Sequence, residues 1–116
     1  MNIEELREYC MDKKHVTESF PFDNETLVFK VMNKMFALTG INKNPLSVNL
    51  KCDPEKAVAL REEYSCVLPG YHMSKQHWNT VVIDGSVPDK LVKEWIDESY
   101  NLIVASLPKR VREQMS

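Results

Sequence analysis

Side chains suited to nucleic-acid recognition gather in one short stretch of this sequence, from Lys75 to Asn79. Lys75 and His77 precede an apolar run that predicts a strand, and Trp78 and Asn79 begin it. Lysines bind phosphate oxygens, and an exposed aromatic ring stacks on a base. Tyr71 is a candidate for this role, and so is Trp78 if it lies on the surface; a tryptophan is more often a core residue. The stretch therefore predicts a contact loop for nucleic acid, at residues 69–79.

A predicted sheet supplies further basic residues. Lys30 and Lys51 alternate with apolar neighbours in two predicted strands. Successive strand residues point to opposite faces, so Lys30, Lys51, Ser47 and Asn49 are expected on an exposed face if their apolar neighbours pack under helices. Lys34, at the tip of a predicted hairpin, extends this surface. The predicted nucleic-acid-binding residues are Lys30, Lys34, Lys51, Lys75, His77, Trp78 and Asn79.

The charge of the chain is unevenly distributed. The net charge is −2, so the whole molecule does not attract nucleic acid over long distances. Residues 26–83, however, hold seven bases against four acids, whereas residues 1–25 hold three bases against seven acids. The basic segment is the one that contains the predicted sheet.

Two groups of residues suggest metal chemistry, and each has a simpler interpretation. Cys66, His72 and His77 lie close in sequence, but a specific zinc site needs a complete ligand set at a recognisable spacing. Three acids of the first helix, Glu4, Glu8 and Asp12, recur at steps of four residues and present oxygen ligands to a hard or ferrous cation. Acids at that spacing are also typical of a solvated helix face.

No motif indicates an enzyme or a cofactor site. The three glycines form no phosphate-binding loop, and the serines and cysteines lack the neighbours that activate a nucleophile. The cysteines, odd in number and without a CxxC pair, are expected to be reduced and buried. No apolar run approaches the roughly 20 residues that cross a bilayer. We therefore expect a cytoplasmic, non-catalytic protein without a membrane partner, as a monomer or weak homodimer.

Local signals place these residues on a mixed α and β framework. Helices are expected from Asn2 to Asp12, from Asp53-Pro54 onward, and from a capping box at 86–89 to Pro108. Strands are expected around 27–32, 35–38, 46–51 and 78–83, the first two joined by a turn at Asn33-Lys34. Phe20 and Phe22 are expected to anchor their connection in the core. Apolar residues at helical spacing are expected on the buried side of the last helix, namely Leu91, Trp95, Leu102 and Ile103. Residues 109–116 read as a short basic tail.

This order lacks the alternation of strands and helices that builds a parallel sheet. An antiparallel sheet with helices on one face is the natural packing, which is a two-layer α+β sandwich. At 116 residues the chain is expected to form one domain with one core.

Several segments resemble the MmcQ/YjbR family over about residues 1–112. They are residues 51–55 (KCDPE), 68–75 (LPGYHMSK), 77–81 (HWNTV), 96–103 (IDESYNLI) and the strand 35–38 (MFAL). The resemblance implies an α-β-β-β-α-β-β-α domain, similar to secretion chaperones and loosely to frataxin-like proteins. It also implies DNA binding through a double-wing arrangement, and no catalytic residues.

Three functions compete. DNA binding through the basic sheet face and the 69–79 loop is favoured, because the resemblance and the basic central segment agree. A protein-interaction or chaperone-like domain requires an exposed apolar patch. Frataxin-like metal binding requires the acidic first helix.

Overall fold

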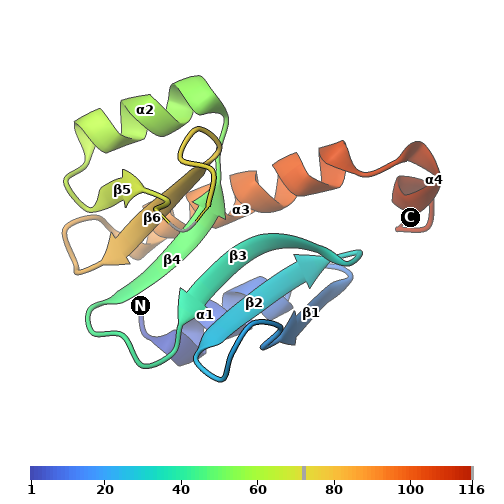
Figure 1. Ribbon diagram of the computed structural model, residues 1–116, viewed down its shortest axis with the longest axis horizontal. Helices are drawn as coiled ribbons and strands as arrows, with labels where there is room; N and C mark the ends of the chain where they lie inside the picture. The colour runs from blue at the N-terminus through green and yellow to red at the C-terminus, as the bar shows by residue number, and fades with distance from the viewer. Residues whose placement is uncertain (72, 116) are drawn as a thin grey trace.

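The computed structural model describes residues 1–71 and 73–115, which form six strands and four helices (Figure 1). In chain order these are α1 (Ile3–Met11), β1 (Val16–Ser19), β2 (Thr26–Val31), β3 (Lys34–Gly40), β4 (Leu46–Lys51), α2 (Pro54–Glu63), β5 (Val67–Pro69), β6 (Trp78–Ile83), α3 (Asp89–Ser106) and α4 (Lys109–Glu113). The order matches the one expected, with an added edge strand, β1, and a short terminal helix, α4. None of the described helices is long and apolar enough to cross a membrane.

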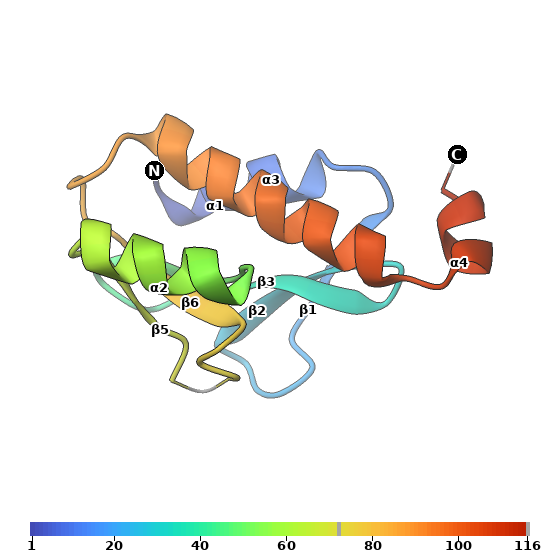
Figure 2. The same ribbon diagram turned by 90° about the horizontal axis from the view of Figure 1, so that it is seen from above.

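The strands form one antiparallel sheet in the order β1-β2-β3-β4-β6-β5. Helices α1, α2 and α3 all lie on one side of it, and the 20–25 and 70–77 loops project from the other side (Figure 2). The main core fills the space between the layers and includes Leu6, Phe29, Phe36, Val48, Leu50, Val81, Trp95, Ile96 and Ile103. The predicted two-layer α+β fold with helices on one face is confirmed.

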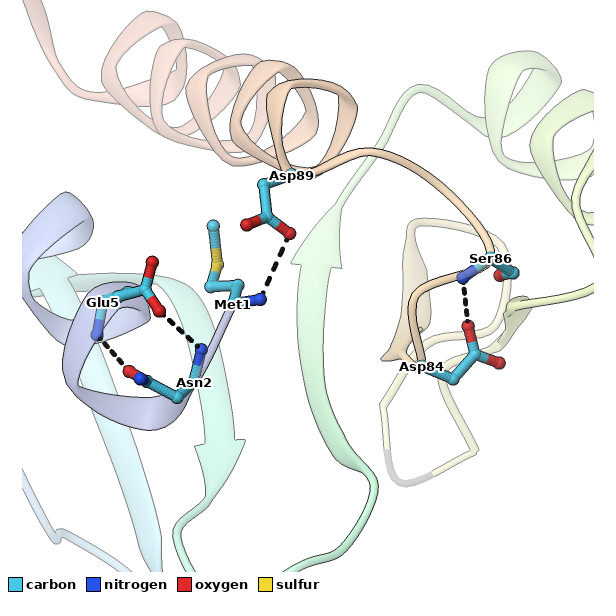
Figure 3. A network of polar contacts seen from close by, with 6 residues as sticks. All are labelled: Met1, Asn2, Glu5, Asp84, Ser86 and Asp89. Atoms are coloured by element: carbon cyan, nitrogen blue, oxygen red, sulfur yellow. Dashed lines mark hydrogen bonds and ion pairs between the residues drawn. The ribbon is translucent and has the colours of Figure 1, made fainter.

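The first two helices begin as their sequences predict. Asn2 caps α1 by accepting the backbone N–H of Glu5 at 2.8 Å, while the Glu5 carboxylate accepts the N–H of Asn2 at 3.4 Å (Figure 3). Asp53 caps α2, and Pro54 occupies its first turn. Each cap satisfies N–H groups that a helix start leaves without a partner.

The capping box predicted at 86–89 is wrong. The N-cap of α3 is Pro88, which has no side-chain acceptor. The Asp84 carboxylate instead accepts the backbone N–H of Ser86 at 3.0 Å, and Asp89 forms an ion pair with the amino group of Met1 at 3.2 Å (Figure 3). This ion pair joins the starts of α1 and α3 across the helical layer.

The β2–β3 turn lies one residue earlier than predicted. Its central residues are Met32 and Asn33, with φ of 48° and 69°, and Val31 pairs with Lys34 across it. Positive φ at both positions is typical of a type I′ turn, whose twist matches that of the flanking strands. Lys34 is therefore the first residue of β3 rather than part of the turn.

Three further sequence predictions are corrected. Phe20 and Phe22 do not anchor in the core, because their side chains are 45% and 64% exposed. Leu102, expected on the apolar side of α3, is exposed, and Val92 and Ile96 take the buried positions. Where a basic tail was expected, Lys109–Glu113 form α4, which begins after Pro108.

The seam between β3 and β4 depends on side-chain hydroxyls. Only two residue pairs, Ala37 with Leu50 and Leu38 with Asn49, align across it. Beyond them, the fully buried Ser99 of α3 accepts the N–H of Lys51 at 2.9 Å and donates to the carbonyl of Phe36 at 2.6 Å. The Ser99 hydroxyl thus bridges β3 and β4 next to the Ala37–Leu50 pair, where the two backbone groups have Ser99 as their partner.

Replacing Ser99 with alanine should lower the free energy of unfolding by about 2–4 kcal/mol, because it leaves two buried backbone groups without partners at about 1–3 kcal/mol each. The better helix propensity of alanine offsets only a few tenths of this. Urea denaturation followed by tryptophan fluorescence measures the change.

Ser106→Ala is the matched control on the same helix. Its hydroxyl donates to the carbonyl of Ile103 and accepts the Lys34 ammonium at the exposed end of α3. This variant should change stability by less than about 0.5 kcal/mol. A loss below about 1 kcal/mol in Ser99→Ala would contradict the bridging role.

Candidate nucleic-acid interface

The sheet face opposite the helices, here called the open face, is defined by the strand register. Residues directly opposite each other in an antiparallel pair share a face. Lys51 pairs with Trp78, Asn49 with Thr80, and Val28 with Leu38. Alternation along the strands completes the open face with Thr26, Lys30, Met35 and Ser47.

A groove of about 360 Å³ lies over the β3–β4 seam on the open face. Met35 and Leu38 of β3 line it with Met73 of the 70–77 loop, and Phe22 of the 20–25 loop forms part of its rim. Its polar lining residues are Asp23, Thr26, Thr39, Lys43, Ser47 and Asn49. The groove lies where strands β1-β2-β3 meet strands β4-β6-β5, and it is lined by residues of both the 20–25 and the 70–77 loops.

Trp78 lies beside this groove in a second, smaller apolar cluster. Val28, Leu38 and Trp78 form the cluster, and Met35 and Met73 pack against it. Because only 8% of the Trp78 surface is exposed, the prediction that its ring stacks on a ligand is wrong. The ring packs against Met73 of the 70–77 loop instead.

The 70–77 loop is held against β6 and α2 by backbone hydrogen bonds. The Gly70 N–H donates to the carbonyl of Trp78 at 2.9 Å, and the Trp78 N–H donates to that of Ser74 at 2.9 Å. Arg61 of α2 donates to the carbonyl of Lys75 at 2.8 Å. The described part of the loop is therefore fixed at both ends.

Tyr71 and Lys75 are the exposed aromatic and the exposed base of this loop. The Tyr71 side chain is 62% exposed, and the Lys75 ammonium lies 5.3 Å from the centre of its ring. A cation over a ring face is attracted to the ring quadrupole. The pair presents a stacking surface and a positive charge together.

Of the other sequence-predicted residues, only some lie on the open face. Lys30 and Lys51 lie there and are half-buried, and His77 is half-buried at the end of the loop. Lys34 is misplaced by the prediction, because it pairs with Val31 and its ammonium donates to Ser106 of α3 at 2.7 Å.

Asn79 is also misplaced by the prediction. It lies on the helix side, 2% exposed, where its amide donates to the carbonyl of Ala57 at 3.2 Å and accepts from Arg61 at 3.1 Å. Its role is to join α2 to β6.

The sequence analysis did not select Phe22, Lys43 or Met73, which line the groove. The sequence around Phe22 indicates an exposed loop, because Phe22 follows Pro21 and has polar residues after it. No local sequence pattern indicates that Lys43 and Met73 line a groove, since only the tertiary fold brings their loops over the seam.

The acids of the protein are unevenly distributed between the two layers. Glu18 is the only acid in the six strands, and it lies on the helix side, bonded to Arg7 of α1 at 2.5–2.9 Å. Most acids are on α1, α2 and α3. The strand residues of the open face carry two lysines, Lys30 and Lys51, and no acid.

One carboxylate, Asp23, lies at the rim of the groove. It accepts the backbone N–H groups of Glu25 and Thr26 at 2.8 and 2.7 Å, and these bonds hold its pKa below the usual value. Asp23 is therefore ionised at neutral pH, and this part of the rim is negative.

Two of the buried thiols, Cys10 and Cys52, are held in the protonated form by burial. Cys10, Cys52 and Cys66 are free and buried, as predicted. Burial raises the pKa of Cys10 to about 12 and also raises that of Cys52. A thiol, not a thiolate, is present at neutral pH in both, and only the thiolate attacks electrophiles.

The metal arrangements considered from the sequence are not assembled within residues 1–71 and 73–115. No group of three or more His, Cys, Asp or Glu side chains is placed there to hold a metal ion. On α1, Glu8 and Asp12 share their surface with Lys93, whose ammonium lies over the ring of Tyr9. His72, the middle member of the Cys66–His77 arrangement, lies outside the described residues.

Gly70→Ala should lower the free energy of unfolding by about 1–3 kcal/mol, the usual cost of overpacking. A Cβ at position 70 would lie 2.9 Å from the carbonyl oxygen of Trp78 and 3.0 Å from its Cβ, so the loop must move away from β6. Thermal unfolding measures the loss. Ser74→Ala, at an exposed position in the same loop, is the control, and equal stability of the two variants would show that the loop is not packed this closely.

Comparison with known proteins identifies the family. The YjbR family model matches residues 11–102. Protein YjbR of Escherichia coli strain K12 is 39% identical over 113 residues, which cover 97% of this chain and 96% of the relative.

Two crystal structures have the same architecture. Deinococcus radiodurans protein DR2400 is 42% identical with a TM-score of 0.92, over 98% of this chain and 87% of that chain. A Pseudomonas syringae protein, target PsR293, is 28% identical with a TM-score of 0.75, over 88% of this chain and 98% of that chain. The chain therefore belongs to the MmcQ/YjbR family, as the resemblance of its loops and strands predicted.

Proposed function

We propose that this protein binds DNA, without catalysing a reaction, through the open face and the 70–77 loop. The observation that carries the proposal is the uneven distribution of the acids between the layers. The strand residues of the open face carry lysines and no acid, whereas the acids lie mainly on the helices. A polyanion is therefore attracted to one face of a protein that is acidic as a whole.

The lysines and the exposed aromatic residue have complementary roles in this proposal. Lys30, Lys51 and Lys75 contact phosphates, and Tyr71 stacks on a base. Because the net charge is −2, affinity should be modest, on the order of 10⁻⁶–10⁻⁴ M at physiological salt, and should fall as salt rises.

The triple variant Lys30→Gln, Lys51→Gln, Lys75→Gln should bind single-stranded DNA at least about tenfold more weakly than the natural chain. Each lost phosphate contact reduces the slope of log K against log salt by about 0.7, so the slope should become shallower by about 2. Fluorescence anisotropy at several salt concentrations, with single- and double-stranded oligonucleotides, measures both quantities.

The matched control is Lys14→Gln, Lys90→Gln, Lys93→Gln, which removes the same charge. Lys90 and Lys93 are exposed on α3, and Lys14 is exposed between α1 and β1. Its slope should stay within about 0.5 of the natural value. Equal weakening in both triple variants would assign the effect to net charge and remove the open face from the proposal.

A protein partner is the second candidate, and the exposed apolar residues of the loops favour it. Phe20, Phe22 and Tyr71 are 45%, 64% and 62% exposed, and all lie in the loops that project from the sheet. Exposed apolar side chains that gather into a patch mark interaction sites in soluble proteins. A partner held this way would bind independently of salt, which distinguishes it from DNA in the same titration.

A further inference from the structure

We propose that the groove over the β3–β4 seam receives an unpaired base of the bound DNA strand. This inference rests on the proposed function and adds a ligand class to it: single-stranded DNA with one base inserted between the 20–25 and 70–77 loops.

The apolar lining suits a flat, polarisable ring. Met35, Leu38 and Met73 cover the inside of the groove, and the Phe22 ring at its rim is 64% exposed. Thioethers adapt to irregular shapes and make favourable contacts with aromatic rings. A base that stacks on Phe22 removes apolar surface of both partners from water. The groove volume of about 360 Å³ is at the small end of the range for ligand pockets.

Polar groups at the groove match the edge of a base. The Asn49 side-chain oxygen already accepts the hydroxyl of Thr80. Its amide nitrogen makes no hydrogen bond with any residue in the described part of the chain, and Lys43 brings a second donor to the rim. These N–H groups can donate to the ring nitrogen and carbonyl acceptors that unpaired bases expose.

The charges at the groove determine which part of a nucleotide enters. The Asp23 carboxylate is ionised and lies at the groove together with the ammonium of Lys43, so the two charges cancel and the groove has no net positive charge to hold a phosphate. The lysines of the open face, Lys30 and Lys51, do not line the groove. Phosphates therefore belong over these lysines and the neutral base belongs in the groove. A base inside a duplex is paired and stacked, so the arrangement selects a single strand.

The methionines of this protein provide the test. The six methionines divide into Met35 and Met73 at the groove and four that pack on the helix side, Met1, Met11, Met32 and Met115. Methyl NMR of the ¹³C-methionine-labelled chain would follow all six during titration with an oligothymidylate of about ten nucleotides, an abasic strand of the same length, and free thymidine.

Base insertion predicts that the oligothymidylate and thymidine shift the Met35 and Met73 methyl signals and leave the other four in place. The abasic strand, which retains the phosphates, should leave all six unchanged. Equal shifts with the abasic strand, or binding of oligothymidylate without any shift at Met35 and Met73, would overturn the inference while leaving DNA binding intact. If thymidine moves these signals but no strand binds at low salt, the proposed function fails and the base site stands.

A pair of variants gives an independent readout by affinity. Phe22→Ala should weaken oligothymidylate binding about tenfold, the usual cost of losing one stacked base, and should not change binding of the abasic strand. Phe20→Ala is the matched control, because Phe20 is also an exposed aromatic of this connection but does not line the groove. Equal affinities of the two variants for oligothymidylate would contradict a base stacked on Phe22.

Discussion

The hydroxyl group of Ser99 connects the helical layer to the seam of the sheet, and the candidate interface depends on that seam. It accepts the N–H of Lys51 in β4 and donates to the carbonyl of Phe36 in β3, and so bridges the two strands. At the other end of the seam, the Thr39 hydroxyl donates to the carbonyl of Ser47 at 2.7 Å. Two buried side chains thus hold β3 and β4 together where the backbone ladder is short, and the groove forms over this short ladder on the outer side.

The surroundings of the seam explain why one face is available to a ligand. All three long helices pack on the other face, together with most of the acids. The two loops that project from the open face carry the exposed rings of Phe22, which lines the groove, and of Tyr71, and Trp78 packs against Met73 of the 70–77 loop. Charge and shape therefore divide the surface into a basic platform and a largely apolar groove with a negative point at Asp23. In the proposed complex, this division would separate phosphate contacts from base contacts.

Helix capping and strand alternation, which are local sequence patterns, predicted much of the fold and part of the candidate site. Asn2 and Asp53 were recognised as caps because their acceptors lie at fixed offsets from the N–H groups they satisfy. Strand alternation placed Lys30 and Lys51 on the correct face. Asn79 and Lys34 were misplaced because their faces depend on register and turn length, and the turn includes a methionine at positive φ, which propensity does not predict. Ser99 was detectable as a polar residue within the apolar stripe of α3, but its partners are 48 and 63 positions away in sequence.

The central claim is that DNA lies on the open face and not on the helices. Lysine acetylation with and without a saturating single-stranded oligonucleotide, read by mass spectrometry, tests it directly, because bound phosphates shield lysine ammonium groups from the reagent. If DNA binds the open face, we expect Lys30, Lys51 and Lys75 to be protected from acetylation. Lys14, Lys90 and Lys93 should react at the same rate in both samples. Protection of the helix-layer lysines with unchanged reactivity of the open-face lysines would contradict it.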